Sequence, residues 1–258
     1  MYLSRIQLTP AIAKHSQLGH ILRDSCYAMH RLLWDLFDQN ERFLFREEQV
    51  RDQLEEYRNL PLYYVLSRTK PKADNPFFNI ESKCFQPKLK EDDQLSFCLR
   101  ANPTITRRVE GKKNSTRHDV IMDAQYQWLK KNCIERGIPM SGSKSNLRCL
   151  LASHDDFSGE EGFQRMSDAI QIEMTNASVQ WLSKRGVANG FTVMEGSVQS
   201  SGYQWHALPK KGRNAGFSAL DYEGVLAITE PEKFISALFR GIGPAKAFGC
   251  GLLLIKRT

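Results

Sequence analysis

GIGPAKAFGCG, residues 241–251, and the apolar run Leu252–Ile255 behind it are the part of this sequence that most limits its fold. Four glycines and one proline among eleven residues exclude a helix interior and an ordinary strand. Residues 230–240 are expected to form a short helix with Pro231 in its first turn, and the apolar run a buried strand. Because glycine lets a backbone or a ligand come close, the loop is either a tight connection or a platform for a nucleic-acid phosphate beside Lys246.

The glycine spacing does not match the common nucleotide-binding motifs. The dinucleotide fingerprint needs a glycine where Lys246 stands, and the GxxxxGK[ST] phosphate loop is absent. Both motifs also follow a strand and precede a helix, whereas this loop is expected to follow a helix and precede a strand. The sequence therefore disfavours a nucleotide-binding enzyme built on this loop.

Length and composition indicate a globular protein of about two modest domains. The 258 residues are 41% hydrophobic and 25% charged, and no run approaches the roughly 18 apolar residues of a membrane span. The N-terminus reads as a strand and not as a secretory leader. Six cysteines lie at least fourteen residues apart without a CxxC pair, which argues against a zinc site or a disulfide scaffold. We therefore expect a cytoplasmic protein without membrane, metal or cofactor.

The net charge of +7 is unevenly distributed along the chain. Six lysines and arginines against one acidic residue lie in 100–118, and eight against four lie in 200–258. Such clusters are typical of a face that binds a polyanion, although a solvated surface gives the same pattern.

Hydrophobic periodicity divides the chain into two parts. Residues 1–103 are expected to form an antiparallel α+β layer, with 77–87 irregular, strands over 2–8, 42–49, 60–67 and 94–103, and a helix over 26–37. A basic linker or hairpin follows at 104–118. The second part, 119–258, is expected to contain a weakly periodic segment at 137–162, helices over 119–136 and 167–185, and strands over 191–196, 203–208 and 217–228.

The helix at 26–37 carries an unusual outer face. Its core side is formed by the small and apolar residues Cys26, Met29, Leu33, Leu36 and Phe37. The opposite side carries four polar or aromatic residues, Tyr27, His30, Arg31 and Trp34. A histidine can trade a proton near neutral pH, and a tyrosine one turn away can hold a nucleophile or a phosphate oxygen. A surface histidine without a role is the alternative, and no HxxEH or HExxH pattern indicates a metal.

The loop Pro209–Asn214 lies between two expected strands and carries Lys210, Lys211 and Arg213 without an acidic residue. It is either a finger that enters a nucleic-acid groove or a solvated turn.

Four segments together resemble the CasE-type CRISPR repeat endoribonucleases, the RNA-processing subunits of type I-E Cascade. They are MYLSRIQL at 1–8, YAMH at 27–30, FCLRANP at 97–103, and VQWL at 179–182 with the GIGPAKAFGCGLLL loop at 241–254. The resemblance covers the chain except roughly 121–166, which we interpret as an insertion.

This resemblance implies the α+β class, with two tandem ferredoxin-like (RRM-like) βαββαβ domains and antiparallel sheets. The first, 1–103, would carry the catalytic helix, and the second, 119–258, the basic hairpin and the glycine-rich loop. It also implies metal-independent cleavage of precursor CRISPR RNA at the 3′ base of the repeat hairpin, with CRISPR RNA and other Cascade subunits as partners. The aromatic signature with which RRM domains stack bases is missing, which fits recognition of a duplex by backbone and shape.

The family's catalytic residues correspond to Tyr27 and His30. The residues expected to bind RNA are Arg31, Lys210, Lys211, Arg213, Gly241, Gly243, Lys246, Gly249 and Gly251. RNA supplies its own nucleophile, the 2′-OH, so the protein must align it, move protons and stabilise charge. His30 would take the 2′-OH proton or protonate the 5′-oxygen, leaving a 2′,3′-cyclic phosphate and a 5′-OH. The alternative is a non-catalytic subunit that only binds the hairpin.

Overall fold

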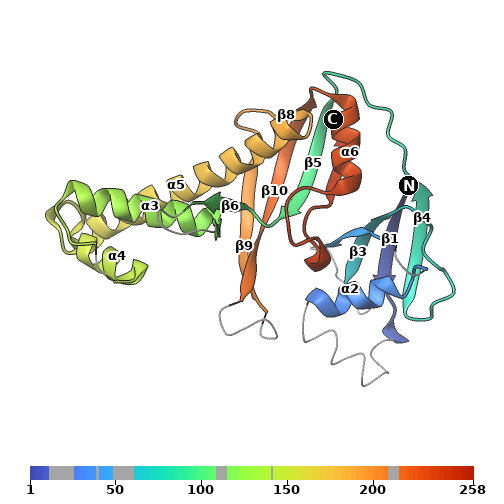
Figure 1. The fold of residues 1–258 in the computed structure, drawn as a ribbon, viewed down its shortest axis with the longest axis horizontal. Coiled ribbons are helices and arrows are strands. Elements are labelled where there is room, and N and C mark those ends of the chain that lie inside the picture. The colour runs from blue at the N-terminus through green and yellow to red at the C-terminus, as the bar shows by residue number, and fades with distance from the viewer. Residues whose placement is uncertain (12–25, 39–40, 49–60, 109–114, 141, 209–214) are drawn as a thin grey trace. The chain divides into compact units, whose positions relative to one another are not determined.

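The structure is a computed structural model that describes residues 1–11, 26–38, 41–48, 61–108, 115–140, 142–208 and 215–258. It divides into two compact units (Figure 1). The first comprises residues 1–102 and 186–258, and the second comprises residues 103–185. No described helix is long and apolar enough to cross a lipid bilayer.

The first unit contains a four-stranded antiparallel sheet with the order β2-β3-β1-β4. Its strands are β1 (Tyr2–Leu8), β2 (Leu44–Glu48), β3 (Leu62–Ser67) and β4 (Phe78–Cys84). On β1 the residues Ser4, Ile6 and Leu8 are buried and Arg5 between them is exposed, because successive side chains point to opposite faces. The inner face is covered by helix α2 (Cys26–Trp34), and together they enclose an apolar core.

The segment 77–87 was expected to be irregular, and that prediction is wrong because it contains β4. β4 is an edge strand whose outward positions are mostly polar or exposed. Only Phe78 and Ile80 pack against the core, which leaves too short an alternation for the sequence to reveal.

A second antiparallel sheet in the same unit has the order β11-β5-β10-β8, and β9 also pairs with β10. The strands are β5 (Gln94–Ala101), β8 (Phe191–Val193), β9 (Gln199–Ala207), β10 (Gly216–Ile228) and β11 (Leu253–Arg257), with helix α6 (Pro231–Arg240) before β11. From its position in the sequence, β5 is expected beside the N-terminal strands, but it lies between β10 and β11. The local apolar pattern of a strand identifies the strand and not its partners.

Two sets of contacts join the sheets of this unit. Leu44 and Leu66 of the first sheet form a buried apolar cluster with Leu252, which precedes β11. In the second set, the carboxylate of Asp221 on β10 accepts hydrogen bonds from Arg100 on β5, the two shortest from Nε to Oδ1 at 3.1 Å and from Nη2 to Oδ2 at 2.9 Å. Arg46 of β2 reaches the same carboxylate, with Nη2 3.4 Å from Oδ1. One acidic side chain on the second sheet therefore pairs with an arginine from each sheet.

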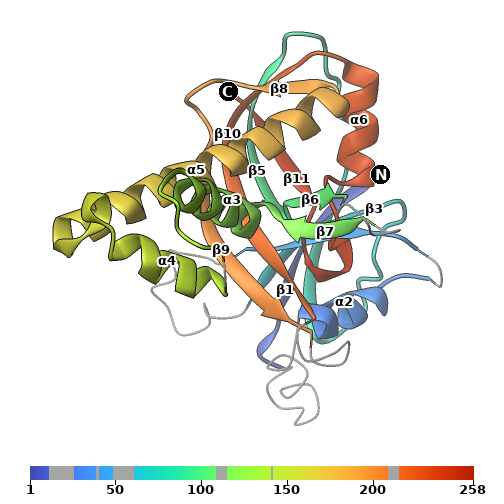
Figure 2. The same ribbon diagram turned by 60° about the vertical axis from the view of Figure 1, so that its left-hand side comes forward.

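The second unit is mostly helical (Figure 2). It begins with the hairpin of β6 (Thr104–Arg107) and β7 (Thr116–Asp119). Helices α3 (Val120–Glu135), α4 (Lys144–Ala152) and the first part of α5 (Gly159–Ala188) then pack around a core of Leu129, Cys133, Leu147, Leu151, Met166 and Ile170. α4 lies in the segment of low periodicity; it is short and capped by Ser143, whose hydroxyl accepts a hydrogen bond from the backbone N–H of Asn146 at 3.3 Å.

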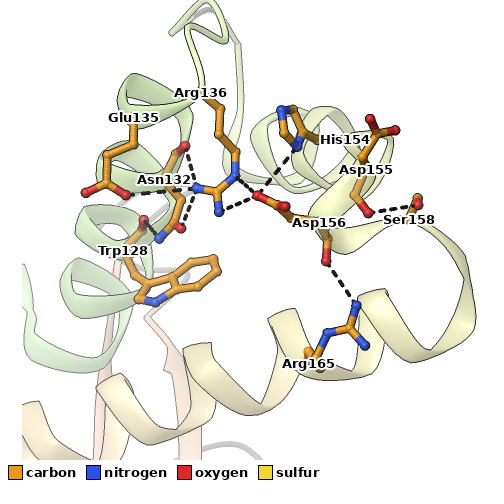
Figure 3. Close-up of polar contacts among 9 residues, drawn as sticks. All are labelled: Trp128, Asn132, Glu135, Arg136, His154, Asp155, Asp156, Ser158 and Arg165. Atoms are coloured by element: carbon orange, nitrogen blue, oxygen red, sulfur yellow. Dashed lines mark hydrogen bonds and ion pairs between the residues drawn. The ribbon is translucent and has the colours of Figure 1, made fainter.

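A polar cluster connects α3 with the turn that precedes α5 (Figure 3). Arg136, after α3, places Nη2 2.9 Å from Oδ2 of Asp156 in the turn η2 (Asp155–Phe157), and its Nη1 donates to Oδ1 of Asn132 at 2.9 Å. The same guanidinium lies 4.8 Å from the centre of the Phe157 ring. The cluster therefore fixes the end of α3 to the turn before α5, which is a structural role.

Candidate functional site

Helix α2 holds His30 between the core and the surface. Met29 and Leu33, on the expected core side, are buried, as are Leu36 and Phe37 just beyond the helix. On the other side Arg31 is exposed and Trp34 is 36% exposed. The side chain of Tyr27, the second expected catalytic residue, lies outside the described residues. His30 differs from the expectation of a solvent face, because it is only partly exposed.

Aromatic rings surround the imidazole of His30. Its centroid is 5.1 Å from that of Phe43, with 22° between the planes, so the two rings are stacked. The rings of Trp34 and Phe45 lie 5.6 Å and 5.9 Å away, both tilted. Burial among these rings lowers the pKa of His30 from its ordinary value, because the charged imidazolium loses hydration. At neutral pH the neutral form therefore predominates, and it can accept a proton.

The glycine-rich loop is a tightly closed structure around the short turn η4 (Lys246–Phe248). The N–H of Ile242 donates to the carbonyl of Gly251 at 2.9 Å, and the N–H of Gly251 donates to the carbonyl of Arg100 on β5 at 2.7 Å. Gly241 has φ 77°, and a Cβ there would lie 2.8 Å from a methyl carbon of Leu44. Gly251 has φ 93°, and a Cβ there would lie 2.9 Å from the carbonyl oxygen of Ile242. This geometry explains the glycines as a close connection, and contact with a phosphate stays a prediction.

The same loop lies against the helix that carries His30. η4 packs on α2 and β2, as Figure 1 shows where the red segment after α6 meets the blue helix. Phe45 lies between them: its ring is 5.9 Å from that of His30, and a Cβ at Gly249 would be 3.4 Å from its Cε2 atom. The fold thus brings together His30 and the glycine-rich loop, which come from opposite ends of the sequence.

Lys246 contributes a cation to this region. Burial lowers its pKa, and the positive charge of Arg240 lowers it further. Among the described residues no carboxylate forms an ion pair with Lys246. A phosphate placed here would relieve both the lost hydration and the repulsion.

The two strands expected on either side of the basic loop are present and pair with each other. β9 and β10 pair as far as Ala207 and Gly216, and the N–H of Leu208 donates to the carbonyl of Ala215 at 2.7 Å. The tip with Lys210, Lys211 and Arg213 lies outside the described residues. Trp205, which is 53% exposed on β9, lies over Gly216, where a Cβ would be only 2.4 Å from the indole.

Sequence reasoning did not single out Phe43, Phe45 or the Arg46–Arg100–Asp221 cluster. Phe43 and Phe45 stand two residues apart in an expected strand, so their shared face was visible, but the helix that it meets was not. Nothing in the sequence links Arg46, Arg100 and Asp221, because Arg100 and Asp221 meet through the pairing of β5 with β10 and Arg46 reaches them from the other sheet. Within the described ranges, no group of three or more histidine, cysteine or acidic side chains could hold a metal ion.

Comparison with known proteins gives a consistent result. The family described as CRISPR associated protein matches residues 1–257. The CRISPR-associated endoribonuclease Cse3 of Thermus thermophilus is 25% identical over 274 aligned residues, covering 99% of this chain and 99% of the relative. The structure of Thermus thermophilus Cse3 bound to an RNA representing a pre-cleavage complex has a TM-score of 0.62 and 24% identity, with 99% of this chain and 98% of that chain covered.

A chain of a CRISPR RNA-guided surveillance complex has a TM-score of 0.55 and 17% identity, with both chains fully covered. These two structural similarities are evidence about the fold alone. They confirm the predicted class, α+β with antiparallel sheets in two ferredoxin-like domains.

Proposed function

Because this chain belongs to the CRISPR associated protein family, we propose that it is an endoribonuclease that binds the CRISPR repeat stem-loop and cleaves precursor CRISPR RNA. Cleavage falls at the 3′ base of the hairpin and needs no metal. The observation that carries the proposal is His30, a neutral imidazole held among aromatic rings beside the glycine-rich loop. A subunit that only bound RNA would need cations, but it would not need this imidazole.

In the proposed reaction the 2′-OH next to the scissile phosphate attacks the phosphorus in line. His30 is largely neutral at pH 7, which suits removal of the 2′-OH proton, and the imidazolium that forms can then return a proton to the departing 5′-oxygen. Tyr27, three residues earlier on α2, would orient the 2′-OH or the phosphate. Arg31 and Lys246 would offset the negative charge of the phosphorane. The products are a 2′,3′-cyclic phosphate and a 5′-OH.

Binding in this proposal depends on the second sheet. The hairpin β9–β10 would place Lys210, Lys211 and Arg213 in a groove of the stem, where they contact phosphates. The glycine-rich loop, with Gly241, Gly243, Gly249 and Gly251, would lie against the RNA backbone next to Lys246. We propose that the protein works in the cytoplasm as a subunit of Cascade, and a structural relative is a chain of a CRISPR RNA-guided surveillance complex.

The test is incubation of the purified protein with repeat hairpin RNA in EDTA, followed by mapping of both new ends. The proposal predicts one cut at the 3′ base of the stem, a cyclic phosphate and a 5′-OH. Tight binding without any cut would contradict it and support the non-catalytic alternative. Cutting that requires added Mg²⁺ would contradict the metal-independent mechanism.

A further inference from the structure

We propose that Phe43 and Phe45 are positioning residues for His30: Phe43 fixes the plane of the imidazole, and Phe45 fixes its distance from the glycine-rich loop. This inference rests on the proposed function and identifies the side chains that hold the reacting group in place. Neither phenylalanine is expected to touch RNA, because both are buried.

The ring of Phe43 is itself held in place by a second aromatic ring, that of Phe37. Its ring stacks on that of His30 at 5.1 Å and on that of Phe37 at 5.1 Å, with interplanar angles of 22° and 27°. Phe37 is buried in the core beneath α2. Through this stack, the packed core restricts the orientation of the imidazole. A histidine on a helix surface without such a neighbour would exchange rotamers freely.

Phe45 connects the imidazole with the loop. Its ring lies 5.9 Å from His30 and 6.5 Å from Tyr63 in the middle of the sheet, and Gly249 packs against its edge. A shift of Phe45 would move His30 relative to Gly249 and Lys246, the groups proposed to lie beside the phosphate. The two phenylalanines are neighbours on one face of the chain entering β2, so their spacing is fixed by the strand.

Positioning of this kind matters for proton transfer. Catalytic groups must be held within about 0.5 Å and 10–20° of the productive geometry, and a displacement of about 1 Å can cost roughly 10²-fold in rate. The rings of Phe43 and Phe45 form an aromatic wall, which also excludes water from one side of the imidazole. The elements around it carry other ionisable groups: Cys26, Tyr27 and Arg31 on α2, Arg46, Glu47 and Glu48 on β2, Tyr63 and Tyr64 on β3, and Lys246 on η4.

The experiment compares Phe43→Leu with the control Phe78→Leu. Phe78 belongs to the same buried core but lies on β4, at the edge of the sheet opposite β2. Both variants lose a ring of equal size, so both should lower the thermal midpoint, and both retain every ionisable group. The pKa of His30 in the free protein is measured by NMR titration and assigned with His30→Gln. The single-turnover rate at saturating protein and the Kd for the repeat hairpin are measured beside it.

We expect Phe43→Leu to raise the pKa of His30 toward 6.5 and to slow cleavage about tenfold, within the range that misplacement of a catalytic group allows. The Kd should change less than about twofold, and Phe78→Leu should change neither the pKa nor the rate. Phe45→Leu should slow cleavage to a similar extent. Equal effects of Phe43→Leu and Phe78→Leu on the rate, or an unchanged pKa, would overturn the inference.

Failure of the proposed function is a separate result. A wild-type protein that binds the hairpin and never cuts it would refute the nuclease while the titration still reports on the aromatic wall.

Discussion

Asp221 is expected to be a main support of the contact between the two sheets of the first unit, and Asp221→Asn tests this. The substitution keeps the shape and removes the negative charge that faces Arg46 and Arg100. The side chain of Arg46 is only 5% exposed, its Nη1 has no hydrogen-bond partner among the described residues, and Glu48 would remain its one acidic neighbour at 2.7 Å. Removing one partner of a fully buried pair costs about 3–5 kcal/mol.

The side chains of Asp221 and Arg100 are 19% and 26% exposed, so water recovers part of that cost. We therefore expect Asp221→Asn to lower the free energy of unfolding by about 2–4 kcal/mol. At roughly 2–4 °C per kcal/mol for a chain of this size, the thermal midpoint should fall by about 4–16 °C.

The assay is thermal unfolding measured by calorimetry, with Glu223→Gln as the matched control. Glu223 lies two residues further on β10 and is exposed, so its loss should change stability by no more than about 0.5 kcal/mol. Adding Arg46→Met to Asp221→Asn removes the uncompensated charge and should recover part of the loss. A fall of less than about 1 kcal/mol in Asp221→Asn would refute the reasoning. The apolar cluster around Leu252 and the packing of η4 on α2 and β2 would then hold the sheets together.

Three further outcomes are expected. A single 2′-deoxy nucleotide at the cut should stop cleavage and leave binding unchanged, as gel assays of both can check, and a normal rate would exclude the 2′-OH as nucleophile. Replacing Lys210, Lys211 and Arg213 by alanine should flatten the plot of log K against log salt by about 0.7 to 0.9 per lost phosphate contact, and an unchanged slope would identify the tip as a solvated turn. Because burial lowers the pKa of His30 and His206, the unfolded chain binds protons that the folded chain does not. The free energy of unfolding should therefore keep its full value above pH 6.5 and fall as the pH decreases below it. The thermal midpoint, measured at pH 7.5 and 5.5, should fall less for His206→Gln than for the wild type.

Most regular elements of this chain could be predicted from its sequence, because their patterns are local. The alternation in β1, the apolar stripe of α2 and the proline-started helix α6 each follow from residues within one element. The pairing of β5 with β10 and β11 could not be predicted, since the choice of partner depends on residues more than a hundred positions away. β4 and α4 were missed because one is a polar edge strand and the other is a short helix that depends on its cap.

In the candidate site, too, the local features could be predicted from the sequence and the long-range contacts could not. The outer face of α2 identified His30, and the glycines identified the loop, but their proximity depends on packing across the sheet. The place of Phe43 and Phe45 beside His30 could not be predicted for a related reason, because the two residues have the sequence pattern of any buried strand. Their relation to His30 exists only after the strand and the helix meet.

The central claim is that His30 carries the chemistry. The most direct test is the single-turnover cleavage rate of His30→Ala at saturating protein in EDTA, with the Kd for the same repeat hairpin measured in parallel. Loss of a positioned acid or base predicts a rate lower by about 10²-fold or more, with the affinity nearly unchanged, since no cation has been removed. Cleavage by His30→Ala at the wild-type rate would contradict the account, and the proton-transfer group would then have to be another residue.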